Sequence, residues 1–239
     1  VIIDENGKMV ANITLRSRIN SVLSAEDALN QAIEQVSDLH SPKDLTYLVG
    51  TGYGRNKVPF ADENISEISC HAMGVHVADP NVDVKGIAVD KDGTVLNFAM
   101  NDKCAAGTGR FFEAMARAFE MDLDQFSKLS LKAKNIIPIT AQCTVFAESE
   151  VISLVGEGKP MDEIAAGIEF SVAKRCFVMA KKAGAVDNVT LTGGCAKNEG
   201  LKEAIEKVLH LKVVNLPIDP QLMGALGAAE FARQKGLAK

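Results

Sequence analysis

Several common signatures of membrane, secreted and nucleic-acid-binding proteins are missing from this sequence. In 239 residues there is no apolar run of about eighteen or more, so no membrane-spanning helix is expected. No basic stretch followed by an apolar one opens the chain, so no secretory leader is expected. The net charge of -5 provides no excess of basic residues for nucleic acid or an anionic membrane. These absences predict a cytoplasmic protein that binds neither nucleic acid nor a membrane.

Cysteine is scarce and lacks the spacings of the common cysteine-rich sites. The five cysteines are odd in number and widely separated, and no two form a C-x-x-C pair. This pattern argues against a disulfide framework, a zinc ribbon and a ferredoxin-type cluster run. A reducing compartment is therefore expected.

The familiar nucleotide and calcium loops are absent or incomplete. No G-x-x-x-x-G-K-[ST] phosphate loop occurs, and Gly50–Gly54 has the spacing G-x-G-x-G rather than G-x-G-x-x-G. A plain glycine turn is the favoured interpretation of that stretch. Asp90–Gly93 resembles the start of a calcium loop, but β-rich runs flank it, which favours a hairpin turn.

The order of hydrophobic patterns predicts an α/β protein with two similar halves. Hairpin patterns at 1–15 and 84–100 are each followed by helical patterns, the first helix capped by Ser24. A strand is expected at 188–194 and another at 212–217, each followed by a helix. With 47% hydrophobic residues and no low-complexity linker, the chain can bury a sizeable core in one large or two small domains.

Two cysteines precede predicted helices. Cys104 lies before a glycine turn in NDKCAAGTGRFFEAM, and Cys143 lies in TAQCTVFAESEVISL. The partial positive charge of a helix N-terminus lowers a thiol pKa and favours an anionic centre. Composition and spacing alone do not decide whether Cys104 and Cys143 have a functional role or only fill space in the core. Cys70 and Cys176 fall within amphipathic helices and are expected to be buried and inert.

Two small-residue stretches together favour a nucleotide site. LTGGCAKN (191–198) brings two glycines to a helix start, where backbone N–H groups are accessible to a phosphate or a flat ring. PQLMGALGAA (220–229) allows either tight helix packing or nucleotide access. Cys195 lies inside the first of these stretches, so its role stays open between packing and function.

These motifs, together with GTGYGR, occur here in the order seen in one family. The sequence resembles the ATP-dependent activators of (R)-2-hydroxyacyl-CoA dehydratases, in the BadF/BadG/BcrA/BcrD ATPase family, over nearly the whole chain. The resemblance implies the acetate kinase–sugar kinase–heat-shock chaperone–actin (ribonuclease H-like) ATPase fold with ATP between two similar domains. We expect residues 1–80 with 221–239 to form the first domain and 81–220 to form the second.

The resemblance also implies a cofactor set and partners. It implies a homodimer that shares one [4Fe–4S] cluster, with Cys104 and Cys143 as the metal ligands, because such a cluster takes four thiolates. It implies ATP, ADP and Mg²⁺, a dehydratase or related reductase component as partner, and ferredoxin or flavodoxin as electron donor. The predicted nucleotide-binding residues are Gly107, Thr108, Gly109, Gly193, Gly194, Ala196, Asn198, Gln221 and Gly224.

The sequence departs from the family at its phosphate turns. No Asp-x-Gly-Ser/Thr turn occurs near the start, and only the tail of the second phosphate motif remains, at 81–85. We expect that segments carrying these loops are missing from the sequence, and Asp83 is the catalytic candidate in what remains. The alternatives are a phosphotransferase of the same fold that acts on a sugar or small acid, and a non-catalytic nucleotide-sensing module.

Overall fold

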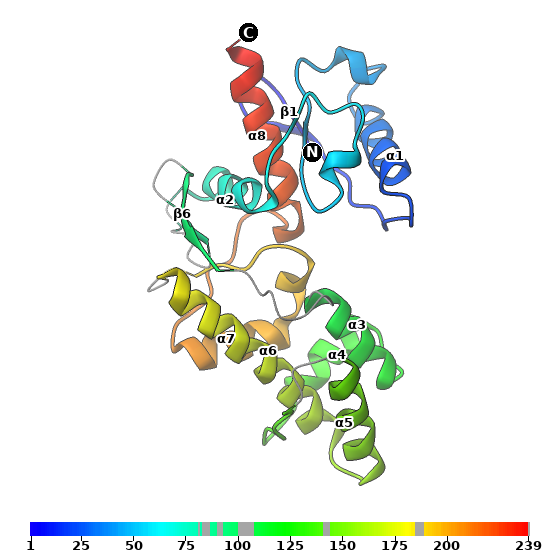
Figure 1. Cartoon of the computed structure of the whole chain (residues 1–239), viewed down its shortest axis with the longest axis vertical. Coiled ribbons are helices and arrows are strands. Elements are labelled where there is room, and N and C mark those ends of the chain that lie inside the picture. The colour runs from blue at the N-terminus through cyan, green and yellow to red at the C-terminus, as the bar shows by residue number, and fades with distance from the viewer. Residues whose placement is uncertain are drawn as a thin grey trace. The chain divides into compact units, whose positions relative to one another are not determined.

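The computed structural model describes residues 1–80, 82, 87–89, 93–99, 108–140, 144–184 and 189–238 (Figure 1). The chain forms two compact units. Unit 1 comprises residues 1–84, 89–96 and 216–239, and unit 2 comprises 85–88 and 97–215. No helix among the described residues has both the length and the apolar character that crossing a membrane requires.

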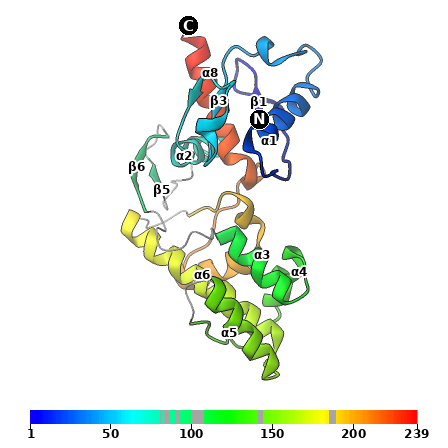
Figure 2. The ribbon, with the colours of Figure 1, turned by 45° about the vertical axis from the view of Figure 1, so that its right-hand side comes forward.

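Unit 1 combines short strands with three long helices. In chain order its elements are β1 (Ile2–Ile3), β2 (Met9–Ala11), α1 (Ser21–Ile33), η1 (Pro42–Asp44), β3 (Val49–Gly50), η2 (Arg55–Lys57), β4 (Glu63–Asn64), α2 (Glu67–Ala78), η4 (Pro220–Leu222) and α8 (Met223–Leu237). Strands β1 and β2 pair antiparallel and form the predicted first hairpin, while β3 and β4 pair parallel. Helix α8 contacts both β1 and β3 (Figure 2).

The predicted second hairpin is also present. Strands β5 (Ile87–Val89) and β6 (Val95–Phe98) form a two-stranded sheet whose residues are divided between the two units. Gly93 follows the predicted turn and has a φ of 80°, a left-handed conformation that glycine adopts without strain.

Helix α1 begins earlier than predicted. Its N-cap is Asn20, whose Oδ1 accepts hydrogen bonds from the backbone N–H groups of Val22 at 3.0 Å and Leu23 at 3.4 Å. The predicted cap, Ser24, lies one turn inside the helix, and its hydroxyl donates to the Asn20 carbonyl. The prediction was wrong because asparagine caps a helix as well as serine does, and Asn20 comes first.

Helices α2 and α8 pack closely through glycines (Figure 1). A Cβ on Gly74 would overlap the carbonyl oxygen of Met223, and one on Gly227 would overlap the carbonyl oxygen of Cys70. Only residues without a side chain allow the two backbones to approach this far. Helices α2 and α8, which are far apart in sequence, therefore pack into the same core of unit 1.

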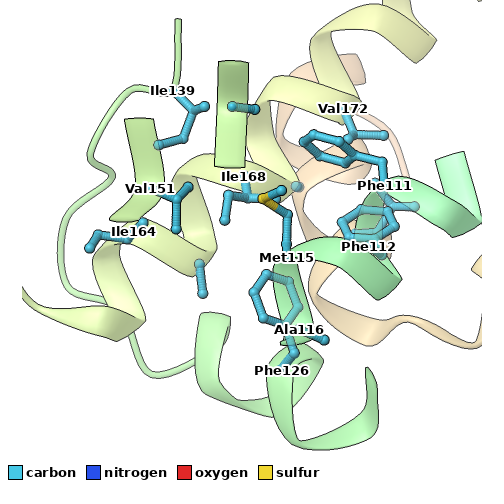
Figure 3. Packing of buried hydrophobic residues seen from close by; sticks show 14 of the residues in the cluster. Phe111, Phe112, Met115, Ala116, Phe126, Ile139, Val151, Ile164, Ile168 and Val172 are labelled. Atoms are coloured by element: carbon cyan, nitrogen blue, oxygen red, sulfur yellow. The ribbon is translucent and has the colours of Figure 1, made fainter. Parts of the chain in front are cut away.

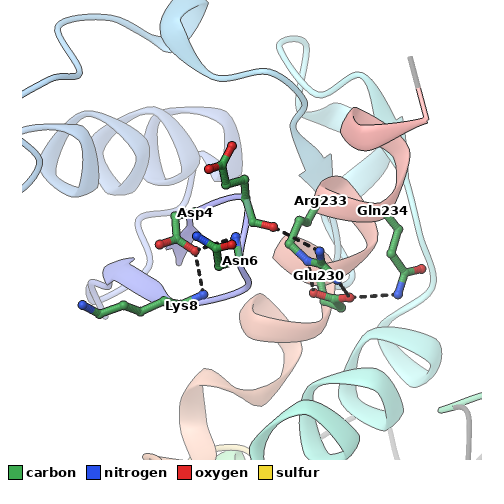
Figure 4. Close-up of polar contacts among 7 residues, drawn as sticks. Asp4, Asn6, Lys8, Glu230, Arg233 and Gln234 are labelled. Carbon is green, nitrogen blue, oxygen red and sulfur yellow. Dashed lines mark hydrogen bonds and ion pairs between the residues drawn. The ribbon is translucent and has the colours of Figure 1, made fainter.

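A buried ion pair attaches the first hairpin to α8 (Figure 4). Glu230 is 6% exposed and accepts hydrogen bonds from Arg233 Nε and Nη2, each at 2.8 Å, and from Gln234 Nε2 at 2.9 Å. Arg233 Nη1 in turn donates to the backbone carbonyl of Glu5 at 3.2 Å. The fork of Arg233 thus connects α8 with the β1–β2 turn.

Unit 2 is mostly helical where it is described, with a single large core (Figure 3). Its elements are α3 (Thr108–Ala118), α4 (Leu123–Ser130), α5 (Thr144–Gly156), α6 (Met161–Ala183), η3 (Gly194–Lys197) and α7 (Glu199–Leu209). Phe126 of α4 lies among the rings of α3, 6.3 Å from Phe112 and 5.5 Å from Phe119 between centroids. Ile164 and Ile168 of α6 are fully buried against this aromatic cluster.

The two strands predicted in unit 2 are reduced to one parallel bridge, between Thr190 and Val214. Val214 N donates to the Val189 carbonyl at 2.8 Å. The Val214 carbonyl accepts the Thr190 hydroxyl at 2.8 Å, in place of the backbone N–H that a longer ladder would supply. The two predicted strands therefore pair with each other, but the described ladder is shorter than the predicted strands.

Candidate functional site

The glycine turn between Thr190 and α7 has the geometry expected of a phosphate- or ring-binding loop. Gly193 has a φ of 80°, and Gly194–Lys197 form the short 3₁₀ turn η3. Two backbone hydrogen bonds close the turn, from Ala196 N to the Gly193 carbonyl and from Asn198 N to the Cys195 carbonyl, each at 3.1 Å. Gly194 is exposed, so its backbone is accessible from outside the turn.

Asn198 joins this turn to the start of α7. Its Oδ1 accepts the Leu201 backbone N–H at 2.9 Å, which makes Asn198 the N-cap of the helix. Its Nδ2 donates to Glu169 Oε1 on α6 at 2.8 Å. Both ends of one amide are therefore engaged, one inside its own helix and one with a neighbouring helix.

The structure brings two of the predicted nucleotide-binding stretches together. Thr108 is the first residue of α3 and Gly109 the second. A Cβ on Gly109 would lie 3.7 Å from Cys195 Sγ in η3, an ordinary contact distance. The first turn of α3 and the glycine turn therefore lie side by side within unit 2.

The thiols around this junction are poor nucleophiles. Burial, and then the neighbouring Cys176, Glu169 and Glu113, raise the pKa of Cys195 to about 11. Burial likewise raises the pKa of Cys176 and, in α2 of unit 1, that of the fully buried Cys70. A thiol in these surroundings stays protonated at neutral pH, which matches the inert role predicted for Cys70 and Cys176.

Two predicted nucleotide-binding residues lie in unit 1. Gln221 is exposed in η4, and its backbone N–H donates to Asp219 Oδ1 at 2.9 Å. Gly224 is buried in the first turn of α8, where a Cβ would lie 3.0 Å from His71 Nε2. Gly224 therefore has a packing role between α8 and α2, in addition to the binding role predicted for it.

The remaining predicted residues lie outside the described part of the chain. They are the catalytic candidate Asp83, the turn residue Gly107 and the cluster ligands Cys104 and Cys143. Among the described residues, no group of three or more His, Cys, Asp or Glu side chains could hold a metal ion. The helices that follow the two cysteines are described: α3 begins at Thr108, α5 begins at Thr144, and the two pack against each other.

Unit 1 also contains a cavity of about 710 Å³ between β1, β3, α1 and α8. Its walls are largely apolar, with Ile2, Leu29 and Leu48 among them. None of the predicted site residues is among the described residues that line it, so it is separate from the candidate nucleotide residues.

One residue with a place in the site was missed by the sequence analysis. Glu169 is 1% exposed and contacts Asn198, yet it falls inside the apolar pattern of the helix at 161–183. The only signal was a carboxylate within the run Ala165–Ala173, most of which is buried. A charged residue at such a position needs a buried partner, and no sequence spacing indicates that Asn198 supplies it.

Comparison with known proteins identifies the family of this chain. Residues 1–232 match the BadF/BadG/BcrA/BcrD ATPase family. An activator of lactoyl-CoA dehydratase from Anaerotignum propionicum is 46% identical over 214 residues, 86% of this chain and 82% of that protein. A 2-hydroxyisocaproyl-CoA dehydratase activator from Clostridioides difficile is 44% identical over 199 residues, 80% of this chain and 74% of that protein.

A solved structure agrees with the sequence relatives. The activator of the 2-hydroxyisocaproyl-CoA dehydratase from Clostridium difficile with bound ADPNP superimposes with a TM-score of 0.88 at 38% identity. The match covers 99% of this chain and 90% of that one. The predicted actin-like ATPase fold and the resemblance to dehydratase activators are thereby confirmed. This chain belongs to the BadF/BadG/BcrA/BcrD ATPase family.

Proposed function

We propose that this protein is an ATP-driven activator that delivers low-potential electrons to a 2-hydroxyacyl-CoA dehydratase or a related CoA-ester reductase. The observation that carries the proposal is the packing of α3 against α5, two helices that begin directly after the Cys104 and Cys143 stretches. The names of the relatives, which are dehydratase activators, support the choice of partner.

Two cysteines per chain fit a cluster that is shared between two copies. A [4Fe–4S] cluster takes four thiolates, and a two-fold axis through paired Cys104 and Cys143 residues would supply them. The cluster, when bound, would supply one-electron chemistry at low potential. The first turns of α3 and α5 would direct their partial positive charge toward an anionic group held there.

The exposed face of α5 supports the second copy. Phe146 is 70% exposed, Ile152 58% and Val155 37%. Phe146, Ile152 and the small exposed residues Ser149, Ser153 and Gly156 lie on one side of the helix, which carries no charged residue, whereas Val155 lies opposite Phe146. Small residues at helical spacing allow two backbones to approach closely, and apolar residues beside them favour burial. We propose that two copies pair through this face.

The nucleotide chemistry is assigned to the glycine turn and its neighbours. The turn at 193–198 and the start of α3 offer backbone N–H groups and small residues for ATP or ADP. Gln221 and Gly224 stay predicted nucleotide-binding residues of unit 1. Hydrolysis in this fold takes Mg²⁺, for which Asp83 is the proposed carboxylate. Ferredoxin or flavodoxin is the proposed electron donor.

Iron and sulfide analysis of anaerobically purified protein tests this proposal. We expect about four irons for two chains and an EPR signal after reduction. Cys104→Ser and Cys143→Ser are each expected to abolish both. Cys70→Ser and Cys176→Ser are the matched controls and are expected to keep them. An iron-free protein with full ATP-dependent activation of a dehydratase would contradict the proposal, as would a Cys104→Ser variant that retains its iron.

A further inference from the structure

Buried polar side chains of unit 2 converge on one point, the start of α7. Ser127, Ser130 and Glu169 are the buried polar residues of this unit among those described. Gly200 N donates to Ser127 Oγ at 3.1 Å, and a Cβ on Gly200 would overlap Ser130 Oγ and lie 3.3 Å from Glu169 Oε1. Buried polarity is costly unless it is hydrogen-bonded, so its concentration beside the glycine turn requires an explanation.

Glu169 is the unusual member of this cluster. Oε1 accepts the hydrogen bond from Asn198 Nδ2, whereas Oε2 is buried and has no hydrogen-bond partner among the described residues. Burial raises the pKa of Glu169 to about 8, against a smaller opposing effect of the Asn198 bond. At neutral pH the side chain is therefore mostly an uncharged carboxylic acid.

We propose that Glu169 is a positioning residue of the nucleotide site, because it holds the Asn198 amide and thereby keeps the 193–198 turn in its nucleotide-binding conformation. The connection is short and continuous. Glu169 fixes Nδ2, the other end of the same amide caps α7 through Leu201 N, and the Asn198 backbone N–H closes η3 on the Cys195 carbonyl. The inference rests on the nucleotide site of the proposed function.

The geometry requires an acceptor at Glu169 but no negative charge. The titratable group that faces it is the Cys195 thiol of η3, which is itself uncharged at neutral pH. Helices α4 and α7 present Ser127, Ser130 and Gly200 to it, which are uncharged. Burial and the Asn198 hydrogen bond are the causes of the shifted pKa of Glu169, and no basic side chain is among them. An ionised Glu169 would therefore have to be hydrated. Hydration would separate α6 from α7, so the turn is expected to loosen as the pH rises past about 8.

The test is the dissociation constant for ADP, measured by isothermal titration calorimetry on the anaerobically purified full chain. Glu169→Gln keeps an acceptor for Asn198 and is expected to bind ADP within about twofold of the unaltered protein. Glu169→Met keeps the volume but removes the acceptor, and its Kd is expected to rise about tenfold. Ile164→Ala removes a buried side chain from the same helix. It is the control for a loss of stability alone and is expected to leave the Kd unchanged.

A pH series adds a readout that packing alone would not change. Between pH 7 and 9, ADP affinity is expected to fall in the unaltered protein and to stay constant in Glu169→Gln. Unaltered affinity in Glu169→Met, or equal losses in the Gln and Met variants, would overturn the inference while leaving the proposed function intact. If the unaltered protein binds no ADP, the nucleotide site of the proposed function fails, and the inference fails with it. If the protein contains no iron but the ADP affinities change as expected, only the electron-transfer assignment is refuted.

Discussion

At the scale of single residues, Glu169 and Glu230 are both buried, and their surroundings hold them in opposite ionisation states. Glu169 has one amide as a partner, and burial raises its pKa to about 8. Glu230 receives two hydrogen bonds from Arg233 and one from Gln234, which lower its pKa despite its burial. The difference follows from the number of donors and the presence of a cation, rather than from burial itself.

The Glu230 pair predicts a specific pH dependence of stability. The pKa of Glu230 in the folded protein lies below the ordinary value of 4.5. The pair's contribution to stability is therefore fully present above about pH 4.5 and is lost as the pH falls through the folded pKa. Glu230→Gln is expected to lower the free energy of unfolding by about 2 kcal/mol at pH 7, because a partly buried ion pair is broken. The difference in free energy of unfolding between the unaltered protein and this variant should be smaller at pH 3. Urea unfolding at the two pH values measures it.

Glu113→Gln is the matched control for that measurement. Glu113 pairs with Arg110 at 2.8 Å, but both side chains are well exposed, at 40% and 79%. An exposed pair contributes about 0–1 kcal/mol, so this variant is expected to change stability little at either pH. A gap for Glu230→Gln that is the same at pH 7 and pH 3 would contradict the assigned ionisation.

Which residues the sequence could identify depends on whether their partners are local. The helix that follows the 191–198 stretch was predicted correctly, because its N-cap Asn198 and its apolar pattern are adjacent in sequence. Glu169 was missed because its partner is 29 positions away and belongs to another helix. Cys104 and Cys143 were assigned through long motifs, and their roles stay predictions because neither lies among the described residues.

At the scale of elements, the closest packing in unit 1 is between α2 and α8, at Gly74 and Gly227. Gly74→Ala is expected to destabilise the protein by about 1–3 kcal/mol or more, because the added methyl group overlaps the Met223 carbonyl and the helices must separate. Thermal unfolding measures the change. Gly236→Ala, on the same helix, is the control, since a Cβ there would meet only side chains, the nearest atom being Thr46 Cγ2 at 3.2 Å, rather than a backbone carbonyl. Equal melting temperatures for the two variants would contradict the packing argument.

Helices were predicted better than strands, and the reason is physical. A helix satisfies its hydrogen bonds within one stretch of sequence, so periodicity and caps indicate it directly. The pattern of the sequence predicts one long helix from about Met161 to Lys182, and the observed helix α6 runs from Met161 to Ala183. A strand depends on a distant partner, and the patterns at 188–194 and 212–217 yielded only the Thr190–Val214 bridge. The start of α1 was misplaced because two good capping residues lie within one turn of each other.

At the scale of the whole molecule, the family and fold followed from the order of several motifs rather than from any single one. The assembly is a further prediction. Ile152→Glu places a charge on the exposed face of α5 and is expected to convert a dimer into a monomer and to abolish the bound iron. Sedimentation velocity with iron analysis measures both.

Val178→Glu is the control for the assembly experiment. Val178 is 53% exposed on α6, close to the 58% of Ile152, but belongs to a different helix. This variant is expected to remain dimeric and to keep its iron. A dimeric, iron-containing Ile152→Glu variant would show that the copies do not pair through α5.

The α2–α8 contact also has a consequence for how the chain folds as it is made. Helix α8 leaves the ribosome after all of unit 2, yet it supplies part of the core around α2 and the anchor for the first hairpin. The residues of the unit 2 core lie in one continuous stretch, from Phe111 to Val213, and can assemble before α8 has been synthesised. Domains commonly fold in order from the N-terminus during synthesis. Unit 1, which contains the first hairpin, is completed only when α8 has been made. The first hairpin and the face of α2 that packs on α8 are therefore the surfaces that a nascent-chain chaperone would meet.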